Sequence, residues 1–344
     1  MSNPQIEIFS TCPQSSAVPA ESYVQNIAEV ARWSEEFGCK GILIYTDNSI
    51  VDPWLTSTIV LQNTARLCPL VAVQPVYMHP YSVAKMVTSL AYIFGRRVYL
   101  NMVAGGFRND LAALNDTTPH DKRYSRLVEY TGIISKLVTS AEPVAFKGKF
   151  YQVENLRLQP PVPPELAPQI FISGSSQAGL EAAEELNAVA IHYPEPPEEC
   201  RLALKTGTRA GIRVGIIARE SEQEAWQVAN GRFPASRKGE LTHELAMKTS
   251  DSVWHKQLCA DKEVATQVHS PYWLRPFETY KSFCPYLVGS YSQVTDFVSA
   301  YISRGFHTFI LDIPPAREEL LHISIVFQNA VRRLDDETIA ANLS

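Results

Sequence analysis

The segment of residues 173–177 contains the side chains with the clearest chemical implication. It reads Ser-Gly-Ser-Ser-Gln and joins the apolar run of residues 169–173 to an amphipathic stretch at 178–185. A glycine lets the backbone come close to a ligand, and the N–H groups at the start of a helix attract anions. With the hydroxyls of Ser175 and Ser176 as further donors, this turn is suited to a phosphate. The same residues also fit an ordinary serine N-cap, so both interpretations stand at this point.

Polar side chains also lie within or just beyond other short apolar runs. In a barrel of parallel strands, binding and catalytic groups project from the carboxyl ends of the strands and the loops that follow. A polar ring of this kind suits a ligand with several hydrogen-bonding edges. Its members are Thr46, Gln74, Tyr77, His79, Asn101, His192, Tyr193 and Arg213.

Several other kinds of catalytic site find no support in the residues. The eight histidines form no HxxxH or HxH pattern near carboxylates, so no metal site is expected. There is no GxSxG motif, which argues against a serine hydrolase. Gly105 and Gly106 do not form the GxGxxG motif of dinucleotide-binding folds. Cys12 follows the first apolar run with no base assigned to activate it, so we expect a buried spectator thiol there.

The elements that must position these groups alternate regularly along the chain. Eight apolar, β-branched runs are each followed by a stretch with helical spacing, and strands that are apolar on both faces are typical of a parallel sheet covered by helices. Eight such units in 344 residues predict a closed (β/α)8 TIM barrel, an α/β fold, rather than an open doubly wound sheet. The predicted strands are residues 6–10, 41–45, 70–74, 98–104, 169–173, 188–193, 212–218 and 307–313, and the predicted helices include 22–37, 124–137, 178–185 and segments that begin at Pro53 and Pro80.

Two segments are longer than ordinary barrel connections. We expect a single domain of residues 1–344 with insertions at about 140–168 and 232–290. The first has the pattern of a small hairpin followed by a proline-rich crossing. The second is polar and rich in aromatic residues, which favours a lid over the site or an interface.

The composition restricts the class of protein. The formal net charge is −5, 45% of the residues are hydrophobic and 19% are charged, which argues against disorder and against a nucleic-acid binder. No apolar run approaches the roughly 18 residues of a membrane span, and the first residues lack the layout of a signal peptide. The six cysteines lie far apart without a CxxC pair, so no disulfide framework is indicated. We therefore expect a cytoplasmic protein.

Several segments occur together, in order, over most of the chain. They are CKGILIYTDNSIVDPW, NMVAGGFRNDLAALN, PHDKRYSRLVEY, FISGSSQAGLEAAEEL, HYPEPPEE, GIRVGIIARESEQEAW, TSDSV and LVGSYSQVTDFVSAYISRGFHTFIL. With these segments the chain resembles the bacterial luciferase-like flavin-dependent monooxygenases, and most closely their alkanesulfonate monooxygenase branch.

This resemblance implies a cofactor and a set of partners. Members of the family take FMN in its reduced form, FMNH2, from a separate NAD(P)H-dependent flavin reductase, either free or in a transient complex. The reduced flavin reacts with O2 to give a C4a-peroxyflavin that oxygenates a small or carrier-linked organic substrate. The family forms homodimers or homotetramers. Carried over by motif, the residues at the flavin phosphate are Tyr124, Gly174, Ser175 and Ser176, and those near the flavin ring are Thr46, Gln74 and Asn101.

Departures from the sulfonate branch concern the substrate half of the site. The branch has arginine, any residue, histidine in the seventh strand; here Arg213 is retained, but Gly215 replaces the histidine. A loop cysteine becomes Ile50, a tyrosine after the last strand becomes Pro314, and a tryptophan becomes Tyr193. A standard alkanesulfonate is therefore not expected as substrate. Arg213 is expected to hold an anionic group of the substrate or, as the alternative, to form a structural ion pair inside the barrel. Tyr193 and His79 are the other catalytic candidates.

Two alternatives share the fold. One is a hydride-transfer oxidoreductase that uses the deazaflavin F420, and the other is a flavin-binding protein without turnover. Binding of FMN, FMNH2 or F420 distinguishes the cofactors.

Overall fold

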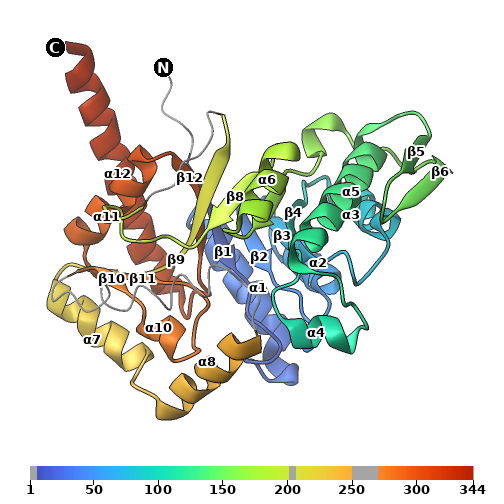
Figure 1. The fold of residues 1–344 in the computed structure, drawn as a ribbon. Coiled ribbons are helices and arrows are strands. Elements are labelled where there is room, and N and C mark those ends of the chain that lie inside the picture. Colours follow the sequence, from blue (N-terminus) through green and yellow to red (C-terminus); the bar gives the residue numbers. More distant parts are fainter. Residues whose placement is uncertain (1–5, 201–206, 250–269, 344) are drawn as a thin grey trace. The chain divides into compact units, whose positions relative to one another are not determined.

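The computed structural model describes residues 6–200, 207–249 and 270–343, and these residues form two compact units (Figure 1). One unit comprises residues 12–191 together with Thr249, and we call it the 12–191 unit. The other comprises residues 6–11, 192–248 and the described residues from 270 onward, and we call it the C-terminal unit. Each unit has its own hydrophobic core, so each is described by itself.

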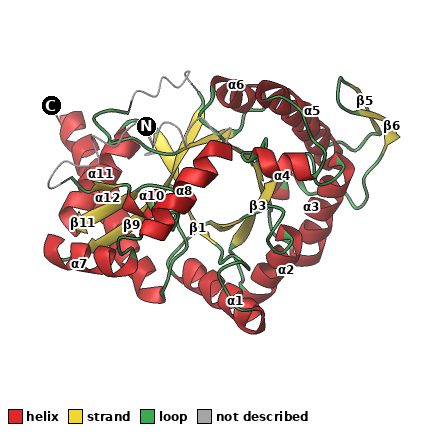
Figure 2. Cartoon of the chain, turned by 60° about the horizontal axis from the view of Figure 1, so that its bottom comes forward, coloured by secondary structure: helices red, strands yellow, loops and turns green. Residues whose placement is uncertain are grey.

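The 12–191 unit is a parallel sheet with helices packed against it. Neighbouring strands pair in parallel, from Gly41 opposite Cys68 to Ser173 opposite Ile191. The strands are β2 (Gly41–Ile44), β3 (Cys68–Val73), β4 (Tyr99–Met102), β7 (Ile170–Ser173) and β8 (Val189–His192), and the helices are α1 (Ala20–Glu36), α2 (Pro53–Asn63), α3 (Pro80–Phe94), α4 (Arg108–Ala113), α5 (His120–Thr139) and α6 (Gln177–Glu185). Figure 2 shows α2, α3 and α5 along the outer side of these strands, and α5 packs against both α3 and α6.

Local sequence signals explain where these helices begin and end. Helix α2 starts at Pro53, and the Asp52 carboxylate accepts hydrogen bonds from the first N–H groups. Helix α3 starts at Pro80 and ends at Phe94, and its C-cap Gly95 adopts the left-handed conformation (φ 61°) that glycine tolerates best. The predictions that helices begin at these two prolines are confirmed.

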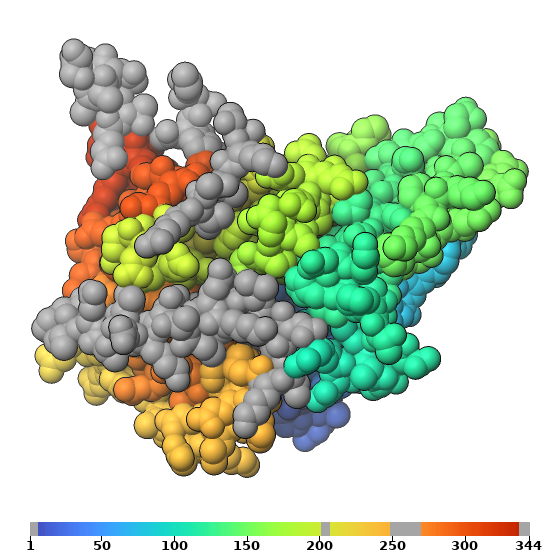
Figure 3. Space-filling view, viewed as in Figure 1, coloured from blue at the N-terminus to red at the C-terminus, as the bar shows by residue number. Residues whose placement is uncertain are grey.

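A hairpin projects from this unit, as predicted for the first insertion. Strands β5 (Val144–Lys147) and β6 (Gln152–Leu156) pair in antiparallel fashion, and a proline-rich segment with a short 3₁₀ turn (Pro164–Leu166) follows. The hairpin, coloured green, forms an outer end of the unit in the space-filling view (Figure 3). The Glu129 carboxylate of α5 holds its turn by accepting hydrogen bonds from the N–H groups of Lys149, Phe150 and Tyr151.

The C-terminal unit contains the remaining barrel strands and an additional pair. The strands are β1 (Glu7–Thr11), β9 (Arg209–Arg219), β10 (Tyr272–Trp273), β11 (Tyr286–Ser290) and β12 (Phe306–Leu311), and the helices are α7 (Glu222–Arg232), α8 (Arg237–Thr249), α10 (Arg275–Glu278), α11 (Tyr291–Ser303) and α12 (Arg317–Leu343). Strand β12 lies between β1 and β9, all in parallel, and β11 extends the sheet beyond β9. Helices α11 and α12 pack against each other, and α7 packs on β9 and β11.

All eight predicted strands are present, with ends that differ by a few residues. The sequence predicts neither β10 nor β11, which lie in the second insertion at 232–290. Strand β11 is buried and pairs with five consecutive residues of β9, so this part of the insertion belongs to the core of its unit. Residues 250–269 of the expected lid lie outside the described residues. Among the described helices, none has the length and apolar character that crossing a bilayer requires.

Candidate active site

A turn with several hydrogen-bond donors, which we call the cradle, joins the end of β7 to the start of α6. Gly174 has φ 154°, and a Cβ added there would lie 2.3 Å from the Tyr124 hydroxyl, so only glycine lets this hydroxyl approach the turn. Ser176 is the N-cap of α6, and its hydroxyl accepts a hydrogen bond from the Gly179 N–H at 3.1 Å. Tyr124 and Ser176 also share a hydrogen bond. The serine N-cap is therefore real, and the tyrosine hydroxyl stands directly beside it.

The electrostatics of this turn favour a bound anion. Burial raises the pKa of the Tyr124 hydroxyl, and the hydrogen bond with Ser176 offsets only part of that rise. Tyr124 is thus a neutral donor at physiological pH. The first turn of α6 adds the partial positive charge of a helix N-terminus. Ser175 lies half-buried in the same turn, so the four residues predicted for a flavin phosphate are together in this unit.

The start of α5 fixes the position of Tyr124. Asp116 precedes this helix and accepts hydrogen bonds from Arg126 Nη2 at 2.6 Å and from the Thr118 hydroxyl at 2.6 Å. Burial alone would raise the pKa of Asp116, but the hydrogen bonds from Arg126 and Thr118 lower it to about 2. The ion pair between Asp116 and Arg126 connects the segment before α5 to the helix.

A cavity of about 210 Å³ opens beside the ends of β2 and β3 in the same unit. Thr46 and Gln74, both predicted near a flavin ring, line it. The wall combines an indole, a thioether and aliphatic side chains with polar groups that include the carboxylates of Asp47 and Asp52. Aromatic and aliphatic walls with convergent polar groups are typical of small-molecule sites. The lining residues are Thr46, Asp47, Ile50, Asp52, Pro53, Trp54, Ala72, Val73, Gln74, Tyr77 and Met78.

Hydrogen bonds hold the polar groups around this cavity. Tyr77 donates its hydroxyl proton to Asn48 Oδ1 at 2.8 Å and accepts from Gln74 Nε2 at 3.4 Å. Burial, together with the charges of Asp110 and Asp47, raises the pKa of Tyr77 to about 12. Asn101, at the end of β4, does not line the cavity; its Oδ1 accepts a hydrogen bond from the Ser173 hydroxyl at 2.9 Å.

His79 has a structural contact of its own. It is exposed and serves as the N-cap of α3, where its Nδ1 accepts a hydrogen bond from the Tyr81 N–H at 3.2 Å. Its ring lies edge-on to that of Tyr151, with centroids 6.2 Å apart, and it is not among the cavity-lining residues. The structure therefore shows a capping contact for His79, and its catalytic role stays a prediction.

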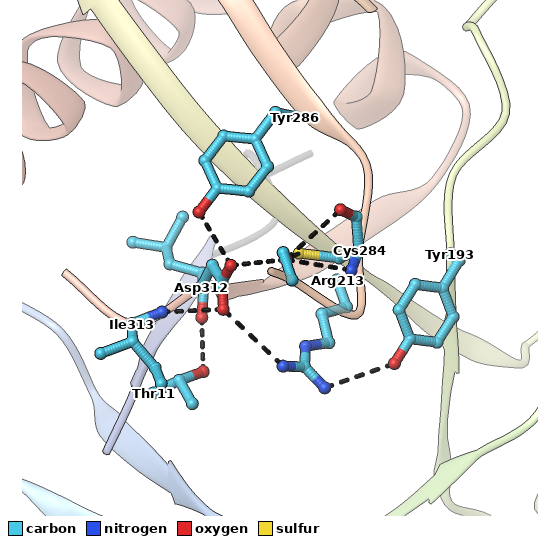
Figure 4. Close-up of polar contacts among 9 residues, drawn as sticks. Thr11, Tyr193, Arg213, Cys284, Tyr286, Asp312 and Ile313 are labelled. Carbon is cyan, nitrogen blue, oxygen red and sulfur yellow. Dashed lines mark hydrogen bonds and ion pairs between the residues drawn. The ribbon is translucent and has the colours of Figure 1, made fainter. Parts of the chain in front are cut away.

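In the C-terminal unit, a buried polar cluster surrounds Arg213 (Figure 4). Arg213 projects from β9, donates a hydrogen bond from Nη1 to the Tyr193 hydroxyl at 3.3 Å and lies 3.9 Å from Asp312 Oδ1. The side chains of Arg213 and Asp312 are 7% and 14% exposed. The structure thus brings Arg213 and Tyr193 together, and their catalytic roles stay predictions. It also places beside Arg213 a carboxylate, Asp312, that the sequence analysis does not single out.

Asp312 and its partners were missed because they meet only in the folded chain. Asp312 follows β12, whereas Ser282 and Tyr286 lie in the second insertion; their hydroxyls donate to Asp312 Oδ2 at 2.6 and 2.8 Å. The one available signal was that Asp312 lies at the carboxyl end of the last predicted strand, residues 307–313, where functional groups project. Burial and the negative charge of Asp312 raise the pKa of Tyr286 well above its usual value, so the phenol stays protonated.

Three further groups near strand ends are held neutral by burial. Burial raises the pKa of the Cys284 thiol to about 12, and it also raises the pKa of the Cys12 thiol strongly. Burial lowers the pKa of His192 to about 4, and this ring packs edge-on against Phe306. Neither thiol is an activated nucleophile. Among the residues that the structure describes, no group of three or more His, Cys, Asp or Glu side chains could hold a metal ion.

Known proteins resemble this chain in sequence and in fold. The 4-(gamma-L-glutamylamino)butanoyl-[BtrI acyl-carrier protein] monooxygenase BtrO of Niallia circulans is 32% identical over 314 residues, which are 89% of this chain and 91% of the relative. The EDTA monooxygenase EmoA of Chelativorans sp. BNC1 superimposes with a TM-score of 0.72 over 96% of this chain and 94% of its own, at 15% identity. An F420-dependent secondary alcohol dehydrogenase superimposes with a TM-score of 0.65 over 95% of this chain and 99% of its own, at 14% identity.

The structural comparisons bear on the fold, and the sequence comparisons bear on the family. The structural likenesses show an α/β fold of the luciferase-like (β/α)8 TIM-barrel class, and the predicted fold class is confirmed. The sequence model described as luciferase-like monooxygenase matches residues 5–308. With this match over most of its length, the chain belongs to the luciferase-like monooxygenase family.

Proposed function

We propose that this chain is the oxygenase component of a two-component system. It takes FMNH2 from a separate NAD(P)H-dependent flavin reductase, free or in a transient complex, and uses O2 to oxygenate an acyl group linked to a carrier protein. The observation that carries the proposal is the cradle at Gly174, where the absence of a Cβ admits the Tyr124 hydroxyl beside the N-cap of α6.

The residues present fit an FMN phosphate. A phosphate needs several donors, and the turn provides the hydroxyls of Tyr124, Ser175 and Ser176 with N–H groups of the first helical turn. Thr46, Gln74 and Asn101 would face the ring system from the ends of neighbouring strands. Bound FMNH2 would supply the electrons that activate O2. The protein's own task is to bind and orient the cofactor and to exclude water.

The substrate class is proposed from the substrate half of the site and from the relative. BtrO acts on an acyl group attached to an acyl-carrier protein, and it shares 32% identity with this chain. Gly215 stands where the sulfonate branch has histidine, so a proton-transferring imidazole is absent from that position. In this proposal Arg213 and Tyr193 contact the substrate, and His79 is the third catalytic candidate. The chain would act in the cytoplasm as a homodimer or homotetramer.

Cofactor binding provides the first test. The Gly174→Ala variant should lose FMN affinity by at least about tenfold while its weaker affinity for riboflavin, which lacks the phosphate, stays unchanged. Gly95→Ala is the matched control, because Gly95 also has a positive φ but its Cβ would meet no atom within 4 Å. Equal losses for FMN and riboflavin, or no FMN binding by the parent protein, would contradict the phosphate site.

Turnover provides the second test. Photoreduced FMN, air and a butanoyl thioester of an acyl-carrier protein should give a product 16 mass units heavier by mass spectrometry. Tight binding of F420 with no oxygen incorporation would instead support hydride transfer. Flavin binding with no product from any acyl thioester would support a non-catalytic flavin protein.

A further inference from the structure

The positive charge of Arg213 is already balanced within its own unit. Asp312 Oδ1 lies 3.9 Å from Arg213 Nη2, and both side chains are largely buried. Tyr193 adds no charge: it accepts a hydrogen bond from Arg213 Nη1, and its ring centre lies 6.0 Å from the guanidinium carbon. Two opposite charges this close cancel most of each other's field at a third group nearby.

Asp312 is held in place by three further donors. Its Oδ2 accepts hydrogen bonds from the hydroxyls of Ser282 and Tyr286, and its Oδ1 accepts one from the Ile313 N–H at 2.9 Å. Hydrogen bonds to an ionised carboxylate are the stronger kind, and three of them restrict its rotation. Asp312 is thus fixed beside Arg213.

The geometry of Tyr286 depends on the glycine in β9. A Cβ added at Gly215 would lie 2.3 Å from Tyr286 Cζ, so the phenol ring fills the space that a side chain at position 215 would need. The ring of Phe233 packs edge-on against the other side, with centroids 4.9 Å apart. The glycine that removes a histidine from this position therefore also admits the tyrosine that fixes Asp312.

We propose that Asp312 is a specificity-determining residue that makes the Arg213 site favour an uncharged acyl carbonyl over a free carboxylate or sulfonate. An incoming anion would meet the Asp312 charge together with that of Arg213, so its attraction is largely cancelled. A neutral carbonyl oxygen needs only an N–H donor, which the guanidinium still provides. The inference rests on the proposed function, and it specifies the reacting end of the substrate as a thioester or amide.

Ligand binding without flavin tests this proposal separately from the oxygenase reaction. The probes are butane-1-sulfonate, butanoate and the neutral butanoyl thioester of N-acetylcysteamine, titrated calorimetrically into the apoprotein. The parent protein should bind the thioester in preference to both anions. Asp312→Asn, which keeps the shape and removes the charge, should bind the two anions at least about tenfold more tightly. Asp296→Asn is the control: it changes the net charge of the protein by the same amount at an exposed site. It should leave the affinities for butane-1-sulfonate and butanoate unchanged.

Two variants of Arg213 make the test decisive. Arg213→Gln alone should weaken thioester binding, and it should weaken sulfonate binding further because the buried Asp312 charge is then unbalanced. Asp312→Asn combined with Arg213→Gln should lose the gain for anions. The proposal is overturned if the parent protein binds sulfonate as tightly as Asp312→Asn does, or if that gain survives in the double variant. Failure of the turnover experiment would overturn the proposed function and leave this ligand preference measurable.

Discussion

The Tyr124 hydroxyl and the Ser176 hydroxyl form one hydrogen-bonded pair at the turn before α6. If the pair receives a phosphate, removal of the phenolic hydroxyl should cost FMN affinity specifically. Tyr124→Phe should weaken FMN binding by about tenfold, equivalent to about 1.4 kcal/mol, because one hydrogen bond to a charged group is lost. Fluorescence titration with FMN and with riboflavin measures the difference.

A second tyrosine of the same helix provides the control for this change. Tyr130 is buried in α5 and donates its hydroxyl proton to the Met78 carbonyl oxygen at 2.9 Å, outside the cradle. Tyr130→Phe should lower the free energy of unfolding but leave the ratio of FMN to riboflavin affinity unchanged. If both variants reduce that ratio equally, the phosphate does not lie at Tyr124.

Single residues differ in how far the sequence predicts their roles. Gly174 and Ser176 are predictable because their functions depend on neighbours in the chain: a turn, a cap and a helix start. Asp312 and Tyr286 are not, because their contact joins two segments 26 residues apart and exists only after β11 pairs with β9. Arg213 stands between these cases, since its position is predictable and its carboxylate partner is not.

The start of α5 is an element whose stability should depend on pH. Asp116 has a pKa lowered from 3.8 to about 2, mainly through its hydrogen bonds with Arg126 and Thr118 against the opposing effect of burial. A depressed pKa stabilises the folded state above the unfolded pKa and loses that contribution as the pH falls through the folded pKa. Asp116→Asn should therefore lower the free energy of unfolding by about 1 kcal/mol at pH 7, and the difference should disappear as the pH falls from about 4 towards 2.

Urea unfolding at several pH values measures this difference. Asp121→Asn is the control, because Asp121 lies in the first turn of the same helix with its side chain 83% exposed. An exposed charge of this kind contributes little to stability. A loss for Asp116→Asn that persists unchanged at pH 2 would contradict the pairing with Arg126.

The β5–β6 hairpin depends on one carboxylate from α5. Glu129 accepts three backbone N–H groups of the turn, so Glu129→Gln should open this turn more often without moving the cradle. Hydrogen exchange of residues 148–151 should accelerate by roughly tenfold, while FMN affinity stays unchanged. Glu154→Gln makes the same change of charge at an exposed position of β6 and should not alter the exchange. An unchanged hydrogen-exchange rate of residues 148–151 in Glu129→Gln would show that the turn is stable without the Glu129 carboxylate.

Elements are predictable where a pattern is long or a terminal signal is strong. The eight apolar runs predict the barrel strands, and Pro53 and Pro80 predict the starts of α2 and α3. Strand β10 has two residues, and β11 follows a polar, aromatic segment, so neither has enough periodicity to be recognised. Their existence depends on pairing with β9, which is a tertiary effect.

For the whole molecule, the fold class and family follow from the order of many modest signals rather than from one motif. No single segment specifies the luciferase-like pattern, but its βα alternation and the segments from residue 39 to residue 311 occur in one order. The substrate half is less predictable because Gly215, Tyr286 and Asp312 act as a set, and a change at one position alters what the others can do. Measuring cofactor binding is therefore a more direct test of the proposed function than screening substrates.

The cradle residues all belong to the 12–191 unit, so bound FMN should stabilise that unit directly. A ligand that binds only the folded state at 100 times its dissociation constant raises the free energy of unfolding by about 2.7 kcal/mol. FMN should raise the apparent melting temperature by several degrees and slow hydrogen exchange in the first turns of α5 and α6. Gly174→Ala, with an affinity about tenfold lower, should show only about half of this stabilisation, about 1.4 kcal/mol, at the same concentration. The same measurements with F420 discriminate between cofactors. Stabilisation by F420 with none by FMN or FMNH2 would reject the oxygenase proposal, because a folded protein that does not bind reduced FMN cannot deliver its electrons to O2.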